Sequence, residues 1–410
     1  MFEAKGKAEK KIWFWISIVV NLGFLGFFKY YNFFIGSFAD LLSSFGFQSN
    51  PWTLQIILPV GISFYTFHGM SYVIDIYYDR IKPTTNFIDY SVFVSFFPLL
   101  VAGPIERATH LLPQIQSKRN FNLNQAVDGS RQILWGLFKK IVIADNCAPY
   151  VNDVFTNYEV YSGSTLALGA IFFAFQIYGD FSGYSDIALG VAKLFGINLL
   201  RNFAYPYFSR DIAEFWRRWH ISLTTWFRDY VYIPLGGSRG SIGRKILNTF
   251  IIFGISGFWH GANWTFIFWG LLNAAYFIPY MLTNTNRKNL ETVAKGKMFP
   301  TLNELFQMTL TFTMCTVAWI FFRSETMTDA FLYIQRLFSS DLFTIPQNIS
   351  MMFLVILFIF LAAEWVMREK THALQITIRS TPVRWAIYFI LSFAIFTLQG
   401  ANEGFIYFQF

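Results

Sequence analysis

Long apolar runs, separated by shorter polar connections, recur from Ile12 to the end of the chain. A helix needs about 20 predominantly apolar residues to cross the hydrocarbon core of a bilayer. Most of the runs reach or approach that length, so the pattern predicts a membrane protein with roughly nine to eleven embedded segments. The segments that we expect are 12–28, 54–78, 87–101, 123–154, 166–195, 246–259, 264–282, 302–322, 349–366 and 384–399.

Two parts of the pattern predict more than a simple span. The segments 246–259 and 264–282 are separated only by His260-Gly-Ala-Asn263, so we expect a helical hairpin that turns there. The segment 87–101 is short and ends at Ala102-Gly-Pro-Ile105, a sequence that stops a helix. We therefore expect it to be tilted or re-entrant.

Composition supports a polytopic membrane protein. The 410 residues are 54% hydrophobic and 14% charged, whereas soluble globular proteins carry about 25% charged residues. No soluble-sized interval separates the apolar runs, so we predict one all-α, membrane-embedded domain over residues 1–410. The net charge of +8 comes from cations that punctuate the apolar runs, which argues against nucleic-acid binding. Cys147 and Cys315 lack the spacing of a metal or redox site.

The distribution of Lys and Arg predicts the topology, because cytoplasmic connections are enriched in both. The N-terminal tail and the connection 201–245 are rich in cations and are predicted to be cytoplasmic, as are Arg80, Lys82 and the cations of 287–297. The connections 32–53 and 158–164 have no Lys or Arg and are predicted to face outward. The hairpin tip at His260 then points to the outer side or to the middle of the bilayer.

A basic, aromatic segment occupies residues 211–230. Five of its apolar residues follow the 3-4-3-4 spacing of one helical stripe: Trp216, Trp219, Leu223, Trp226 and Tyr230. Arg217, Arg218 and Arg228 fall mainly off that stripe, and Glu214 can pair with Arg218. One interpretation is an interfacial helix with its aromatic side in lipid. The other is a segment inside the protein whose cations bind an anionic acyl donor. His220 is equally compatible with a catalytic and with a structural role.

His260 is a stronger candidate for chemistry. Residues 246–286 contain no Asp, Glu, Lys, Arg or Cys and no other histidine. Ionisable residues at membrane depth are costly and usually mark pathways or active sites. A desolvated imidazole is neutral, the form that a general base needs. Gly257 and Gly261 would let a backbone or a substrate come close, with Trp259 and Trp264 as pocket walls. The alternative is a histidine that hydrogen-bonds a neighbouring helix.

Asp180 and Asp186 lie inside the apolar run 166–195 and must be partnered or solvated. An Arg of the basic segment is a plausible partner, and we favour this structural role over a catalytic carboxylate. No P-loop, serine-hydrolase elbow, zinc motif or cysteine nucleophile is present, and the glycine-rich stretch 236–243 is interpreted as a flexible turn.

Several motifs occur together and in order. They are 58–67 (LPVGISFYTF), 102–105 (AGPI), 178–187 (YGDFSGYSDI), 215–220 (FWRRWH), 226–237 (WFRDYVYIPLGG) and 259–261 (WHG). At these residues the chain resembles the membrane-bound O-acyltransferase (MBOAT) family. The resemblance is closest to the bacterial branch with the alginate O-acetyltransferase membrane subunit and more distant to the branch for teichoic acid D-alanylation.

The resemblance implies that His260 matches the essential histidine of the family and His220 its second histidine motif. It implies a helical fold whose funnels from both membrane faces meet near the active site. It also implies an acyl group taken from a cytoplasmic thioester, acetyl-CoA or an acylated carrier protein, and passed through an extracytoplasmic acetyltransferase partner to a polysaccharide. Members of this branch carry further hydrophobic sequence before the segment matching 12–28, so we expect this chain to lack the family's most N-terminal spans.

The leading hypothesis is therefore an O-acetyltransferase of the cytoplasmic membrane with His260 as the base, or as a covalent acyl carrier, and with no bound cofactor or metal. Trp219, Trp259 and Asn263 are expected at the pocket, and Arg217, Arg218 and Arg228 near the donor. Its partners would be the acyl donor, polysaccharide-assembly proteins and membrane lipids. The alternatives are D-alanyl transfer to teichoic acid, export of a lipid-linked carrier, and a scaffold subunit.

Overall fold

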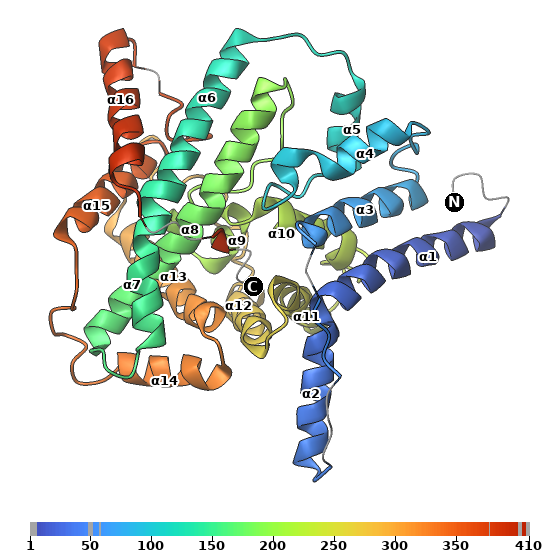
Figure 1. Cartoon of the computed structure of the whole chain (residues 1–410), viewed down its shortest axis with the longest axis horizontal. Helices are drawn as coiled ribbons and strands as arrows, with labels where there is room; N and C mark the ends of the chain where they lie inside the picture. The colour runs from blue at the N-terminus through green and yellow to red at the C-terminus, as the bar shows by residue number, and fades with distance from the viewer. Residues whose placement is uncertain (1–5, 48–51, 57–58, 377, 401–403, 407–410) are drawn as a thin grey trace.

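The computed structural model describes residues 6–47, 52–56, 59–376, 378–400 and 404–406, and these residues form helices and connections without strands. The predicted all-α class is therefore confirmed. Figure 1 shows the helices gathered around α8, with α2 extending away from the body. The α-helices are α1 (Lys7–Leu25), α2 (Tyr31–Ser44), α3 (Ile62–Tyr77), α4 (Phe87–Ser95), α5 (Ala108–Gln116), α6 (Leu123–Leu137), α7 (Asp145–Thr156), α8 (Gly163–Leu194), α9 (Ile212–Arg218), α10 (Ile221–Phe227), α11 (Ile242–His260), α12 (Trp264–Leu282), α13 (Leu302–Arg323), α14 (Met327–Leu337), α15 (Met351–Val366) and α16 (Thr381–Thr397).

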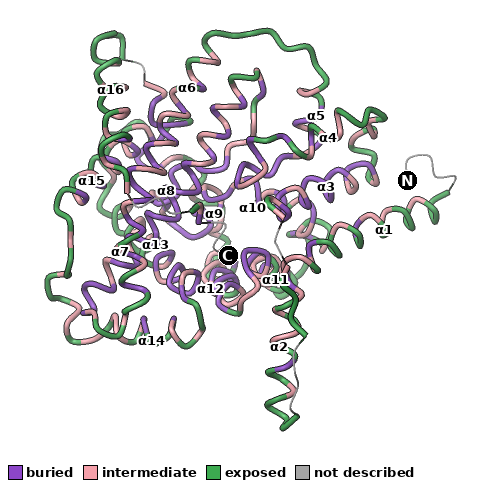
Figure 2. The backbone as a smooth tube through the Cα atoms, in the orientation of Figure 1, coloured by how far each residue is buried: buried purple, intermediate pink, exposed green. Residues whose placement is uncertain are grey.

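Helix α8 is the buried centre of the fold (Figure 2). It packs along α6 through glycines that bring the two backbones together. A Cβ added at Gly136 would lie 2.5 Å from the carbonyl oxygen of Gly183, and one at Gly129 would lie 2.6 Å from that of Gly190. Such contacts between small residues are the usual means by which membrane helices approach closely.

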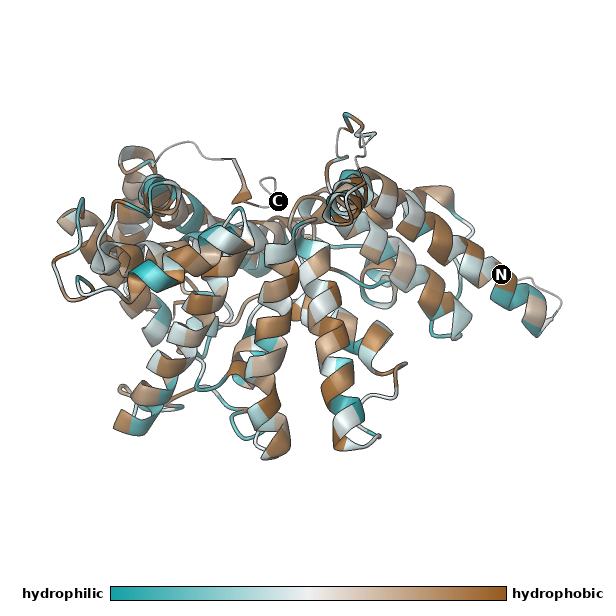
Figure 3. Ribbon diagram, turned by 90° about the horizontal axis from the view of Figure 1, so that it is seen from below, coloured by the Kyte–Doolittle hydropathy of each residue, from teal (hydrophilic) through white to brown (hydrophobic). Residues whose placement is uncertain are grey.

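Helices of membrane-spanning length support a multi-pass membrane protein. In the described part of the chain, four helical stretches are long and apolar enough to cross a bilayer: Lys7–Ser44, Gly163–Leu194, Trp264–Leu282 and Leu302–Arg323. Brown, hydrophobic positions recur along the helices in Figure 3. Many of the outward-facing side chains are large and apolar, including Val19, Phe389 and Phe396, as expected for a surface solvated by lipid.

The first predicted segment needs a correction. The helical structure does not stop near Phe28. Helix α1 is followed directly by a π-helical turn, Gly26–Tyr30, and then by α2. Most of the predicted outward connection 32–53 is therefore helical. The second predicted segment, 54–78, is helical only from Ile62, and its residues 57 and 58 lie outside the described residues.

The other predicted segments coincide with helices, and the hairpin is confirmed as α11 and α12. Gly257 and Gly270 allow its two helices to touch, because a Cβ at either position would lie 2.2 Å from a carbonyl oxygen of the partner helix. The short helices α5 and α14 were not predicted. Both are amphipathic and lack an apolar run of spanning length.

Candidate active site

The basic segment is not one helix, contrary to the stripe that its spacing predicted. Helix α9 ends at Arg218, and α10 begins at Ile221. Between them His220 adopts a left-handed conformation with φ of 42°. The break is held from outside, because the amide of Ile221 donates to the carbonyl oxygen of Asn202 and the amide of Ala204 donates to that of Arg218.

The aromatic side chains of this segment are buried in the protein. Trp216, Trp219, Trp226 and Tyr230 are all at most 9% exposed. The interpretation of an interfacial helix with its aromatic side in lipid is therefore wrong, and the segment forms part of the core.

The cations of the segment have partners within the chain. Arg217 donates to the carbonyl oxygens of Asn286 and Asn289, both at 2.8 Å. The predicted pair of Arg218 with Glu214 is present at 2.9 Å. Arg228 is more exposed and lies 2.7 Å from the carboxylate of Asp229. Arg217 thus ties the basic segment to the loop after α12.

His220 is held in one tautomer. Its Nδ1 lies 3.0 Å from the side-chain oxygen of Asn202, and the hydroxyl of Ser222 donates to the same oxygen at 2.9 Å. An amide oxygen only accepts, so Nδ1 must donate and Nε2 keeps its lone pair. Nε2 is buried and has no hydrogen-bond partner among the described residues. A buried polar atom of this kind is a candidate for contact with a substrate.

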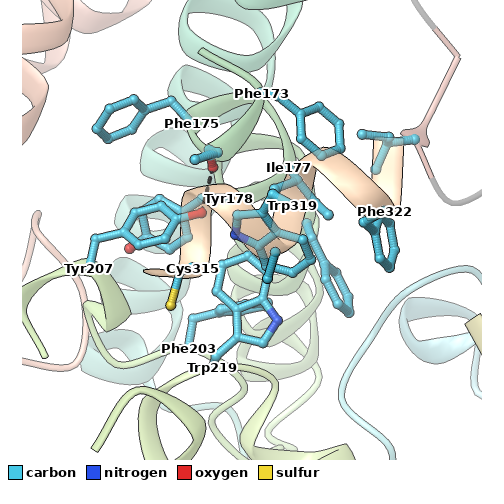
Figure 4. Packing of buried hydrophobic residues seen from close by; sticks show 14 of the residues in the cluster. Phe173, Phe175, Ile177, Tyr178, Phe203, Tyr207, Trp219, Cys315, Trp319 and Phe322 are labelled. Atoms are coloured by element: carbon cyan, nitrogen blue, oxygen red, sulfur yellow. Dashed lines mark hydrogen bonds between the residues drawn. The ribbon is translucent and has the colours of Figure 1, made fainter. Parts of the chain in front are cut away.

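His260 lies at the C-terminal end of α11 and is 8% exposed. Its ring lies against Trp269 and Phe322, with centroids at 5.2 and 5.3 Å. It lines a cavity of about 10 Å³ together with Ile177, Phe181, Trp219, Trp319, Phe322 and Ile406. A volume of about 10–15 Å³ holds one water molecule. Figure 4 shows three of these lining residues, Trp219, Trp319 and Phe322, packed among other buried hydrophobic side chains.

Trp259 connects the two histidines. Its ring centroid is 4.8 Å from that of His260 and 6.3 Å from that of His220. Phe181 lines the His260 cavity and also lies edge-on to His220 at 4.6 Å. Residues 40 positions apart in the sequence thus share one aromatic environment.

Two predicted wall residues lie elsewhere. Trp264 is 57% exposed, so it is not a wall of the cavity, and Trp269 and Phe322 stand beside His260 instead. Asn263 caps α12, accepting from the amide of Thr265 and donating to the carbonyl oxygen of Glu325 at 2.7 Å.

The two aspartates of α8 are paired, but not with arginines of the basic segment. Lys140 bridges Asp180 and Asp145 at 2.7 Å each, and Lys139 pairs with Asp186. The predicted arginine partner was wrong because the π-helical turn Phe138–Ala144 brings two lysines against α8. Asp180 also accepts from the amide of Ile406, whose side chain lines the His260 cavity.

A second small cavity lies on the other side of the aromatic side chains around Trp219. Tyr178, Phe203, Arg201 and the ion pair of Lys139 and Asp186 line it. The rings of Tyr178 and Phe203 are 6.1 and 5.0 Å from that of Trp219, which lines the first cavity. A layer of aromatic side chains therefore separates the polar cavity from the histidine cavity.

Sequence reasoning missed Asn202 and Lys29 as neighbours of the histidines. Lys29 donates to the carbonyl oxygens of Trp259 and His260. It was visible as the one Lys or Arg between residues 12 and 44, and a cation at membrane depth is a recognised functional signal. Asn202 gave no signal, since only the fold brings it to His220.

Comparisons with known proteins agree with these observations. Residues 77–308, which include both histidines, match a family model described as MBOAT, membrane-bound O-acyltransferase family. The chain is 38% identical over 328 residues to a probable alginate O-acetylase of Pseudomonas aeruginosa, covering 80% of this chain and 60% of that protein. It is 36% identical over 355 residues to a peptidoglycan O-acetyltransferase of Helicobacter pylori, covering 80% and 65%.

A teichoic acid D-alanyltransferase of Streptococcus thermophilus is 29% identical over 261 residues, covering 58% of this chain and 61% of that protein. The chain thus spans about three fifths of the length of the curated relatives that it matches.

Proposed function

The chain belongs to the membrane-bound O-acyltransferase family, and we propose that it is an O-acetyltransferase that moves an acetyl group from a cytoplasmic thioester toward an extracytoplasmic polysaccharide. The observation that carries the proposal is the burial of His260 in an aromatic cavity, beside a second histidine whose Nε2 has no partner among the described residues.

In the proposed reaction, His260 takes the proton of an acceptor hydroxyl while the hydroxyl oxygen attacks the carbonyl carbon of the thioester. The tetrahedral intermediate collapses with loss of the thiolate, and the imidazolium returns the proton to sulfur. A positioned base of this kind contributes about 10²–10⁴-fold to the rate. His220, with Nδ1 bound to Asn202, directs Nε2 at an amide N–H of the donor and so orients the thioester. Attack by His260 itself, giving an acyl-histidine, is the covalent variant.

The donor is proposed to be acetyl-CoA or an acetylated carrier protein that enters from the polar cavity at Arg201 and Lys139. Trp219 lines the His260 cavity, and Trp259 lies against the rings of both histidines. Arg217 and Arg218 act indirectly by fixing the loop after α12, whereas the more exposed Arg228 is available to a donor phosphate. Asp180 and Asp186 are structural.

The acceptor is proposed to be an extracytoplasmic polysaccharide such as alginate, reached through a secreted acetyltransferase partner at the cytoplasmic membrane. Beside His260 an acetyl group is favoured over a D-alanyl group, because none of the described residues that line the His260 cavity is a carboxylate. The ammonium of a D-alanyl group would be buried there without a counter-ion, which is strongly unfavourable.

The test is transfer of labelled acetyl from acetyl-CoA in membranes that contain the wild-type chain, His260→Gln or His110→Gln. His110 lies on α5 and is more than a third exposed, so it is a matched control. We expect His260→Gln to lose ~10²-fold or more and His110→Gln to retain activity. Undiminished transfer by His260→Gln would overturn the proposal. Carrier export without thioester consumption would identify a transporter, and polymer acetylation that survives loss of both buried histidines would identify a scaffold.

A further inference from the structure

A lysine in the middle of the N-terminal membrane helix reaches the end of α11. Lys29 lies in the π-helical turn Gly26–Tyr30. Its Nζ donates to the carbonyl oxygen of Trp259 at 2.8 Å and to that of His260 at 3.0 Å. The adjacent Tyr30 donates through its hydroxyl to the carbonyl oxygens of Phe258 and Trp259 at 3.1 and 3.3 Å.

These bonds satisfy the C-terminal end of α11. The last carbonyl groups of a helix have no donor within the helix and carry the negative end of its dipole. After His260 the chain turns at Gly261 into an extended conformation, with φ of −160° and ψ of 152°. The ammonium of Lys29 supplies up to three N–H donors at that point, so the end of α11 is capped from another helix.

The local structure of the N-terminal helix is adapted to this contact. π-Helical turns are rare and occur often at functional sites. Here the turn joins α1 to α2 and carries both donors. The ring of Tyr30 stacks on Phe258 at 4.2 Å, and the ammonium of Lys29 lies 5.9 Å from the ring centroid of Trp259. An unpartnered ammonium at membrane depth would be costly, and the carbonyl oxygens of Trp259 and His260 supply the partners that Lys29 needs.

We propose that Lys29 is a positioning residue for His260, an inference that rests on the proposed role of His260 as the base. By binding the carbonyl oxygens of Trp259 and His260, Lys29 fixes the last turn of α11 and with it the direction of the imidazole. Lys29 touches backbone atoms and not the reacting groups. Since a displacement of about 1 Å can cost ~10²-fold in rate, its loss acts on kcat and leaves donor binding intact.

The experiment compares Lys29→Met, Lys29→Arg and Lys10→Met in the acetyl-transfer assay, normalised to folded protein in the membrane. Lys10 lies on the same helix and pairs with Asp79 near the surface, so the same substitution there is the control. We expect Lys29→Met to lower kcat ~10²-fold with KM for acetyl-CoA within about threefold of wild type. Lys29→Arg, which keeps a charged donor, should restore at least a tenth of the wild-type kcat.

Either of two kinetic outcomes would overturn the inference: a kcat for Lys29→Met within threefold of that for Lys10→Met, or no recovery of kcat in Lys29→Arg. Modification of His260 by diethyl pyrocarbonate, read by mass spectrometry, gives a measure that does not depend on turnover. A released ring should react faster in Lys29→Met than in Lys10→Met, and equal rates would count against positioning. Wild-type activity of His260→Gln would instead overturn the proposed function, so the two failures are distinguishable.

Discussion

At the scale of residues, the two histidines are held in different ways. The ring of His220 is fixed by a polar partner, since its Nδ1 is bound to Asn202. The ring of His260 stands among aromatic side chains, and its backbone carbonyl is bound by Lys29. Changes to polar neighbours should therefore affect the orientation of the His220 ring directly and that of His260 through its backbone.

Asn202→Leu should lower acetyl transfer at least ~10-fold, because Nδ1 of His220 loses its partner and the tautomer is no longer fixed. Leaving that buried group unsatisfied should also reduce the free energy of unfolding by about 1–3 kcal/mol. The comparison variant is Ser222→Ala, which removes a hydroxyl that donates to the same oxygen and accepts from the amide of Ile105, and leaves the bond to His220 in place. Assay of both variants in membranes checks the rate, and thermal unfolding in detergent checks the stability. Equal losses of acetyl-transfer rate in the two variants would contradict a specific effect on His220.

His110 predicts a pH dependence of stability. The hydrogen bond with Glu106 raises the pKa of His110, against a smaller opposing effect of burial. A raised folded-state pKa means that the protonated form stabilises the fold. This stabilisation is complete below the ordinary histidine pKa of about 6.5 and is lost as pH rises through the higher folded-state value.

The check is thermal unfolding of wild type and His110→Gln from below the ordinary histidine pKa to above the raised folded-state pKa. The wild type should be the more stable at low pH, and the difference in stability between the two proteins should narrow as pH rises. A gap that widens with rising pH would show that the sign is wrong.

The candidate site was predictable from the sequence only in part, for a physical reason. His260 was identifiable because a single imidazole in a long apolar run is unusual by itself. Asn202 and Lys29 act through contacts across 18 and 231 sequence positions. Local composition shows that such a group needs a partner but does not show which one. The same limit led to arginine being assigned to Asp180 and Asp186 in place of Lys140 and Lys139.

At the scale of elements, the lengths of apolar runs predicted most helices but not the break at His220. Periodicity continued across that break because the aromatic side chains on both sides of it enter the same core. The break itself depends on two backbone hydrogen bonds with a distant segment: the amide of Ile221 donates to Asn202, and the amide of Ala204 donates to Arg218. The extension of α1 into α2 was missed because Lys29 and its tyrosines resembled the polar end of a span.

The packing of α6 against α8 predicts a strong effect at Gly183. A Cβ there would lie 2.8 Å from the carbonyl oxygen of Gly136 and 3.1 Å from the amide nitrogen of Lys140, both backbone atoms that cannot turn away. Gly183→Ala should therefore cost about 1–3 kcal/mol in the free energy of unfolding. Gly36→Ala on α2 is the control, since a Cβ at Gly36 meets nothing within 4 Å. Fluorescence-detected size-exclusion after heating would report both, and equal melting temperatures would contradict the packing argument.

At the scale of the whole molecule, side-chain contacts join segments that the charge pattern assigned to one side of the membrane. Arg217 binds the carbonyl oxygens of Asn286 and Asn289, which joins two connections predicted to be cytoplasmic. Lys10 pairs with Asp79, beside the predicted cytoplasmic Arg80. The predicted outer connection 158–164 meets Asp341 and Thr344 instead. The contacts thus join connections that were predicted to be cytoplasmic, and they place the loop after α14 beside the connection 158–164.

That topology can be tested by thiol labelling, because the native cysteines Cys147 and Cys315 are buried. Ser340→Cys and Lys288→Cys each introduce a thiol at an exposed position, one in each group. A membrane-impermeant maleimide applied to intact spheroplasts should label Ser340→Cys alone, and permeabilised cells should show both labelled. Labelling of Lys288→Cys in intact spheroplasts would invert the topology. The expected pattern would place the loop after α12, and through Arg217 the basic segment, on the cytoplasmic side, and the loop after α14 on the outer side, as the proposed transfer of an acetyl group across the membrane requires.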